Sequence, residues 1–279
     1  MRIPRYWVRE QRELCGMQCR LRGFSDESMT AAQAMLEEHA RVMQEFFSAP
    51  VTAESLERMR GSVAALAGAR QGEYAADLLE PVCRELDGRN IITRNRYGAL
   101  VLNSTEICFV DVDDPPAGFM DSLLGLVGLG ASPEQLMLRA LHKLHADYPE
   151  LGMRLYETAA GWRVALTGQR LAPGNALQRA LFTRLHADEL YTRLCAAQQC
   201  WRARLTPKPA RLGMAQKYPG QFSSAAATPQ AEAWVQDYLQ RCAGRAVCRL
   251  VDVLGPQQES AALSLHDELT GAASRCALA

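Results

Sequence analysis

The run EICFVDVDDPP, residues 106–116, restricts the fold more than any other part of the chain. Its apolar residues predict a buried strand, which three acidic residues and then two prolines bring to an end. Because side chains alternate between the two faces of a strand, Asp111 and Asp113 point to the same side. The run therefore predicts a strand that holds two carboxylates together at its end.

Two interpretations of these acids remain open at this stage. Hard divalent cations bind several anionic oxygens, so Asp111 and Asp113 can share Mg²⁺ or Mn²⁺. Two such ions can organise an in-line phosphoryl displacement. Alternatively, Asp113 and Asp114 open a turn, since Asp before Pro is common in turns.

The elements around this run predict an α+β fold. Hairpins are expected around Asn103–Ser104 and Ala159–Gly161, and a helix capped by Ser132 lies between them. A second helix over 175–199 precedes a strand from Cys200. The resulting order, β-β-α-β-β-α-β, is typical of a palm-like core in which an antiparallel or mixed sheet carries helices on one face. We expect one continuous sheet with strands near 98–103, 106–113, 153–159, 162–167 and 200–206.

Additions are expected on both sides of this core. The N-terminal part, 1–90, predicts two strands around Cys15–Gly16, a helix opened by Ser25, and helical stretches near 53–69 and 73–86. The C-terminal part, 213–279, predicts a loop, a helix, a strand and a closing helix, over 217–230, 230–242, 246–255 and 259–272 respectively. The sequence thus indicates three successive parts, with the palm-like core at 91–212.

A basic strand follows the second helix of the core. Arg202, Arg204, Thr206 and Lys208 alternate with apolar residues, so they share one strand face. We call residues 202–208 the basic strand. Its like charges need either acidic partners within the fold, such as the two acids of the strand end, or an anionic ligand such as a nucleic-acid backbone.

The second hairpin carries further candidates for phosphate binding. Thr158, Gly161 and Arg163 surround its turn, where backbone N–H groups and a guanidinium can face a phosphate. An ordinary polar hairpin turn is the alternative. The shared parity predicts that Asp111 and Asp113 lie on the same face as Arg163 and the arginines of the basic strand.

Composition limits the other possibilities. Lys plus Arg and Asp plus Glu number 31 each, so affinity for nucleic acid requires a local patch. Nine cysteines without any C-x-x-C spacing argue against a disulfide framework and a structural zinc site. The N-terminus lacks the pattern of a signal peptide, and no apolar run predicts a transmembrane helix, so we expect a cytoplasmic protein without a membrane partner.

The motifs MRIPRYW, TRNRYGALVLN, FVDVD, RLYETAAGWRV and CWRARLTPKP together resemble a family of uncharacterised bacterial proteins. This resemblance covers most of residues 1–212 and implies no particular activity.

FVDVD also resembles the acidic element of the palm in archaeo-eukaryotic-type primases and primase-polymerases. This resemblance implies that Asp111 and Asp113 are catalytic metal ligands for Mg²⁺ or Mn²⁺. TAAGWRV is similar to the next element of that palm, with Arg163 where a histidine is expected. Asp252 is the residue of RLVDVLG offered for the third acid, far downstream.

Three functions follow from these residues. The first is a metal-dependent nucleotidyl or phosphoryl transferase acting on nucleotides or nucleic acid, in which the basic residues neutralise developing phosphate charge. The second is a non-catalytic module that binds nucleic acid or a phosphorylated ligand through the basic strand. The third is a structural or interaction protein, in which the acidic and basic residues neutralise one another.

Overall fold

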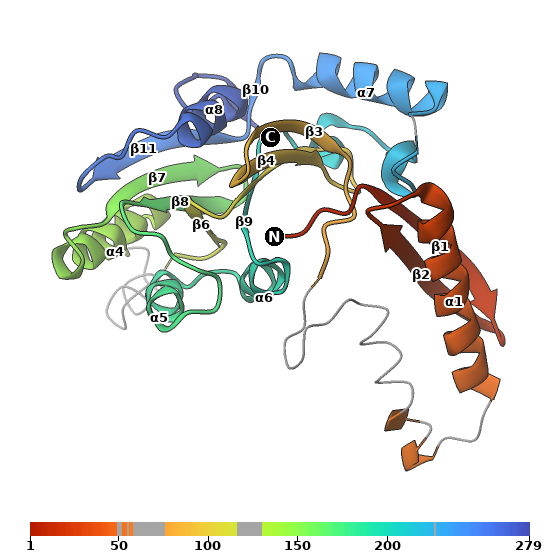
Figure 1. Cartoon of the computed structure of the whole chain (residues 1–279). Helices are drawn as coiled ribbons and strands as arrows, with labels where there is room; N and C mark the ends of the chain where they lie inside the picture. The colour runs from red at the N-terminus through yellow and green to blue at the C-terminus, as the bar shows by residue number, and fades with distance from the viewer. Residues whose placement is uncertain (49–51, 55, 58–75, 116–129, 226) are drawn as a thin grey trace. The chain divides into compact units, whose positions relative to one another are not determined.

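The computed structural model describes residues 1–48, 52–54, 56–57, 76–115, 130–225 and 227–279 (Figure 1). The chain divides into two compact units. The first comprises 1–81, 94–98 and 216–237, and the second comprises 82–93, 99–215 and 238–279. The units interleave along the chain, so their boundaries differ from those of the three successive parts indicated by the sequence.

The first unit opens with the predicted hairpin. Strands β1 (Tyr6–Leu14) and β2 (Met17–Ser25) pair antiparallel along their whole length. The turn residues Cys15 and Gly16 have φ angles of 50° and 76°. Positive φ at both turn positions matches the right-handed twist of a two-residue hairpin, so this prediction is confirmed.

Helix α1 (Met29–Ser48) begins later than expected. Ser25 ends β2, and Ser28 performs the capping, because its Oγ accepts a hydrogen bond of 3.1 Å from the Ala31 backbone N–H. The prediction that Ser25 opens the helix is therefore wrong. The pairing of β2 with β1 keeps Ser25 extended, which leaves the next serine as the first available cap.

The prediction of a helix near 73–86 is also wrong over 76–86, the part of this range that the structure describes. Residues 58–75 lie outside the described residues, as does most of the helix predicted near 53–69. Strand β3 (Val82–Asp87) pairs with β4 (Asn90–Arg94) instead. Asp87 Oδ1 accepts from the backbone N–H groups of Arg89 and Asn90 at 2.7 and 2.9 Å, and this turn favours a hairpin over a helix.

The second unit contains two four-stranded sheets. One has the order β3-β4-β5-β9, with β5 (Leu100–Ser104) antiparallel to β9 (Trp201–Arg204). The other has the order β11-β7-β8-β6, and its neighbours are all antiparallel. Its strands are β6 (Cys108–Val112), β7 (Gly152–Thr158), β8 (Gly161–Thr167) and β11 (Cys248–Leu254).

These two sheets confirm the α+β class and the β7–β8 hairpin, but not one continuous sheet. The predicted hairpin around Asn103–Ser104 is wrong, because β5 and β6 belong to different sheets. Ser104 explains the change of direction. Its Oγ donates to Asn90 Oδ1 at 2.7 Å and accepts from the Ile107 N–H at 2.9 Å, so the chain turns away before β6 begins.

The helix predicted over 175–199 is two helices, α5 (Ala176–Leu185) and α6 (Glu189–Gln198). His186 ends α5 with a φ of 55°, and Asp188 caps α6. The backbone N–H of Asp188 donates to the carbonyl of Asp111 at 2.9 Å. This tertiary hydrogen bond attaches the break between the helices to the end of β6.

Helices cover both faces of the β11-β7-β8-β6 sheet, not one. Helix α4 (Pro133–Asp147), which starts with the predicted Ser132 capping box, and α5 lie on one side, while α8 (Ala261–Thr270) lies on the other (Figure 1). The core between them includes Phe109, Leu141, Leu155, Val164, Phe182 and Leu263. Arg163 and His266, which lie on the α8 side, are therefore buried.

The helix expected near 230–242 is α7 (Pro229–Cys242), and all nine cysteines are free thiols. Strands β10 (Arg245–Ala246) and β12 (Ala277–Leu278) form a short parallel pair, and 3₁₀ turns occur at η1 (Pro209–Leu212) and η2 (Pro219–Gln221). Among the described helices, none is both long and apolar enough to cross a bilayer.

Gly161 allows the β7–β8 turn to approach the end of β6. It has a φ of 137°, and a Cβ atom there would overlap the Val112 carbonyl oxygen and lie 3.0 Å from Cα of Asp113. We expect Gly161→Ala to lower the free energy of unfolding by about 3 kcal/mol. Gly174→Ala is the control, because Gly174 has a φ of 87° but open space around it. Denaturant unfolding that gives equal losses for the two variants would contradict this close approach.

Candidate functional site

The acidic end of β6 meets a buried arginine. Asp111 lies directly opposite Arg163 of β8 in the sheet register. Arg163 Nε donates to Asp111 Oδ1 at 2.9 Å, and Nη2 lies 3.5 Å from Oδ2. The Arg163 side chain is only 2% exposed, whereas that of Asp111 is 34% exposed. The structure thus brings these two predicted site residues together as an ion pair at the edge of the core.

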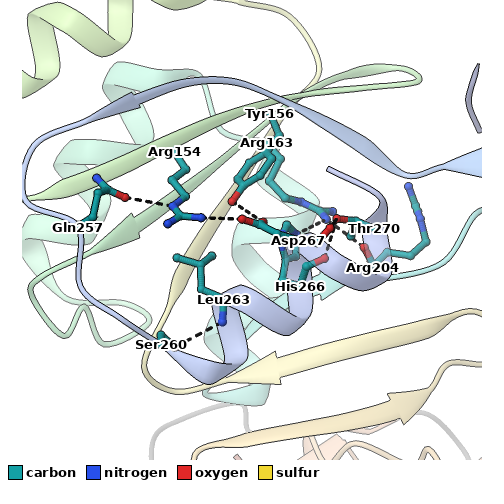
Figure 2. A network of polar contacts seen from close by, with 10 residues as sticks. All are labelled: Arg154, Tyr156, Arg163, Arg204, Gln257, Ser260, Leu263, His266, Asp267 and Thr270. Atoms are coloured by element: carbon teal, nitrogen blue, oxygen red, sulfur yellow. Dashed lines mark hydrogen bonds and ion pairs between the residues drawn. The ribbon is translucent and has the colours of Figure 1, made fainter. Parts of the chain in front are cut away.

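Arg163 also joins the two sheets of the second unit. Its Nη1 donates to the backbone carbonyl of Arg204 on β9 at 3.1 Å and lies 3.5 Å from His266 Nε2 (Figure 2). Burial lowers the pKa of the guanidinium, but the charge of Asp111 and its hydrogen bonds raise that pKa more, so Arg163 stays charged. The group that the sequence assigned to phosphate is occupied within the protein.

A pair of acids lies beside this ion pair. Asp188 Oδ1 accepts from the backbone N–H of Tyr191 at 2.6 Å, which caps α6 and holds the carboxylate next to the end of β6. Partial burial raises the pKa of Asp113, and the charges of Asp188 and Asp111 raise it further. Within the described residues, neither Asp113 nor Asp188 forms an ion pair; we call them the acid pair.

The acid pair, more than Asp111, suits a divalent cation. Both oxygens of Asp111 face Arg163, whereas the two carboxyl groups of the acid pair form no ion pair within the described residues. In the part of the chain that the structure describes, no group of three or more His, Cys, Asp and Glu side chains is arranged to hold a metal ion. A cation at the acid pair would therefore need further oxygens from water or from a ligand.

Three basic residues gather near the acids, and we call Arg204, Lys208 and Arg211 the cation cluster. Arg204 ends β9, and Lys208 precedes the 3₁₀ turn η1 that contains Arg211. The backbone N–H of Arg211 donates to the Lys208 carbonyl at 2.9 Å. The prolines on either side of Lys208 end the strand and start this turn, which folds Arg211 back towards Lys208.

The cation cluster carries more positive charge than the fold neutralises. Burial lowers the pKa of Arg204 to about 10, helped by the charges of Arg163 and Arg211. Burial and the charges of Arg204 and Arg211 lower the pKa of Lys208, whereas Asp113 and Asp111 raise it. Arg204 Nε and Arg211 Nη1 are buried without a hydrogen-bond partner, and no described carboxylate forms an ion pair with any of the three. Such an arrangement favours an anionic ligand.

The other predicted residues have local roles. Arg202 donates to Gln198 Oε1 of α6 at 3.2 Å. Thr206 is buried and accepts from the Leu100 N–H at 2.8 Å. Thr158 Oγ1 donates to the Gly161 carbonyl at 3.1 Å and closes its hairpin. Because β9 ends at Arg204, the alternation predicted for the whole basic strand stops there.

Asp252, offered for the third acid of a primase-like palm, lies apart from the other acids. It is on β11, three strands from β6 in the sheet order, and its Oδ2 lies 3.2 Å from His142 Nε2. Asp188 instead joins Asp113. The helix-capping position of Asp188 is the feature of the sequence that could have indicated it. No feature of the sequence indicates Arg211, because the turn after β9 brings it to the site.

Comparisons of this chain with models of known protein families, with curated proteins and with solved structures find no match. The site is therefore interpreted from its geometry and charges.

The ion pair and the acid pair predict opposite effects of removing one negative charge. We expect Asp111→Asn to lower the free energy of unfolding by about 3 kcal/mol, because it leaves the Arg163 charge buried without its partner. Asp113→Asn should leave stability unchanged or raise it, because it removes repulsion from Asp188 and Asp111. Urea unfolding of the two variants at neutral pH measures both effects. An equal loss in both variants would contradict this division of the acids.

Proposed function

We propose that this protein binds a ligand bearing phosphate groups, either a nucleotide or a nucleic-acid backbone, at the cation cluster. The observation that carries the proposal is the pair of buried guanidinium nitrogens without partners, Arg204 Nε and Arg211 Nη1. Guanidinium groups match the oxygens of a phosphate, and an anion would offset the burial and the like-charge repulsion that together lower the pKa of Arg204 and Lys208.

The acid pair supports a ligand that brings its own cation. Mg²⁺ usually binds through one or two carboxylates together with substrate phosphates and water. Asp113 and Asp188 supply two carboxylates, and Asp113 is close enough to Lys208 to affect its pKa. A phosphate on the cation cluster would complete the oxygen ligands that the described protein groups alone do not provide.

Metal-dependent nucleotidyl or phosphoryl transfer on a palm-like core is the second candidate. The specific observation that favours it is the raised pKa of Asp113, which partial burial raises first and the nearby charges of Asp188 and Asp111 raise further. A bound divalent cation would supply Lewis-acid stabilisation of a phosphoryl group. The cation cluster would orient the phosphates and neutralise charge that develops on their oxygens.

The binding proposal predicts that affinity for a phosphate ligand falls when a charge of the cation cluster is removed, and not when a charge elsewhere is removed. We expect Lys208→Gln and Arg211→Gln each to weaken binding of a nucleoside triphosphate or of single-stranded DNA about tenfold or more, because each removes a charge-assisted contact. Arg179→Gln is the matched control, since Arg179 lies on α5 and donates to the Gly174 carbonyl. Calorimetry for the triphosphate and fluorescence anisotropy for DNA measure the affinities.

Two outcomes of that experiment would contradict the proposal. One is the absence of binding to either ligand by the parent protein, and the other is an equal loss of affinity in the Arg179→Gln control. For DNA, the slope of log affinity against log salt should also fall by about one per lost phosphate contact.

The transfer hypothesis predicts a requirement for the acid pair. We expect Mg²⁺ to strengthen triphosphate binding to the parent and to have no such effect on Asp113→Asn. Incubation of the parent with a labelled triphosphate and a single-stranded or primed template should then yield labelled polynucleotide. If the parent binds the triphosphate but forms no labelled product, the transfer hypothesis is rejected and binding without chemistry remains. If Mg²⁺ strengthens triphosphate binding equally in the parent and in Asp113→Asn, the acid pair does not bind the cation.

A further inference from the structure

His266 belongs to α8, and its side chain lies next to that of Arg163 from β8 (Figure 2). Its side chain is fully buried, and its ring lies 5.0 Å from that of Phe109 and 5.1 Å from that of Tyr156. Both ring nitrogens face polar groups. Nδ1 is 2.9 Å from Asp267 Oδ1, and Nε2 is 3.5 Å from Arg163 Nη1.

These contacts define the protonation of the imidazole. A guanidinium only donates hydrogen bonds, so the Nε2 that faces Arg163 must accept. The ring is then neutral, with its proton on Nδ1 donated to Asp267. Burial lowers the pKa of His266, as does the charge of Arg163, in agreement with the neutral form.

Asp267 attaches this imidazole to the sheet. Its Oδ1 also accepts from the Tyr156 hydroxyl at 2.7 Å, and its Oδ2 accepts from Arg154 Nη1 at 2.6 Å. Tyr156 and Arg154 both belong to β7, so two strand residues fix the carboxylate that orients His266. The imidazole consequently has little freedom to rotate.

The hydrogen bonds that Arg163 donates show the effect of His266 Nε2 as an acceptor. Nε and Nη2 face Asp111, and Nη1 faces the Arg204 carbonyl and His266 Nε2. A buried guanidinium needs acceptors for its N–H groups, so the Nε2 acceptor holds it in the one rotation that reaches both Asp111 and the backbone of Arg204. Arg204 is also a member of the cation cluster, so Arg163 contacts that cluster through the Arg204 backbone.

We propose that His266 is a positioning residue for the phosphate-binding site. Its neutral imidazole fixes the rotation of the Arg163 guanidinium, and Arg163 in turn fixes Asp111 beside the acid pair and Arg204 within the cation cluster. The effect on ligand binding rests on the proposed function, whereas the effect on Arg163 does not depend on it.

A matched pair of variants isolates the acceptor. His266→Gln places an amide oxygen near the position of Nε2, and His266→Met has nearly the same length and volume without that oxygen. Both variants lose the hydrogen bond from Nδ1 to Asp267 and fill similar space, so a purely structural role predicts equal behaviour. Circular dichroism and thermal unfolding check that both variants fold.

Two readouts are compared for the parent and both variants. The first is the exchange of the Arg163 Nε–H proton with water, followed by NMR and assigned with Arg163→Lys. We expect slow exchange in the parent and in His266→Gln, and exchange about tenfold or more faster in His266→Met. The second is the affinity for inorganic triphosphate with Mg²⁺, which should stay within about twofold of the parent in His266→Gln and fall about tenfold in His266→Met.

The two readouts separate the possible failures. Equal exchange of the Arg163 Nε–H in the two variants would overturn the positioning role of His266. Faster exchange in His266→Met with unchanged triphosphate affinity would also overturn it, because Arg163 would then not support the site. If the parent does not bind triphosphate, the proposed function fails, and the proton exchange alone decides whether His266 positions Arg163.

Discussion

The structure of the second unit depends on one buried cation, the guanidinium of Arg163. Moving a charged group out of water is costly, and the cost is offset only where an opposite charge and further acceptors surround it. Asp111 supplies the charge, and the Arg204 carbonyl and His266 Nε2 supply the other acceptors. These groups come from β6, β9 and α8, while Arg163 itself is on β8. The need to satisfy one side chain therefore specifies how two sheets and a helix meet.

The same ion pair determines which charges remain for a ligand. Because Asp111 neutralises Arg163, it is less suited to a cation than the sequence suggested, and among the neighbouring charges that of Asp188 affects the pKa of Asp113 most. Because Arg163 keeps its charge behind the end of β9, it adds to the repulsion on Arg204. The outcome is a local separation of charge, with an acid pair on one side and a cation cluster on the other, in a chain whose formal net charge is zero. A ligand that combines phosphate with a divalent cation complements both.

Local features of the fold could be predicted from the sequence because a few neighbouring residues decide them. The Cys15–Gly16 turn, the Ser132 capping box and the β7–β8 hairpin were of this kind. Predictions were wrong where a turn that the pattern had not indicated, or a tertiary contact, changed the expected element. The Asp87 turn made a strand of residues expected to be helical, Ser104 sent β5 and β6 into different sheets, and the hydrogen bond from Asp188 to Asp111 coincides with the break in a long helical pattern.

For the candidate site, the sequence by itself determined the alternation that points Asp111 and Arg163 to a common face, since strand parity needs no knowledge of distant residues. It also determined that positive charge is concentrated after Trp201. Only the tertiary structure decided which acid is neutralised, that Asp188 joins Asp113, that Arg211 joins Arg204 and Lys208, and that Arg202 faces Gln198 instead. The physical reason is that charge interactions and desolvation depend on distance and burial in three dimensions, and neither quantity is contained in the spacing of residues along a chain.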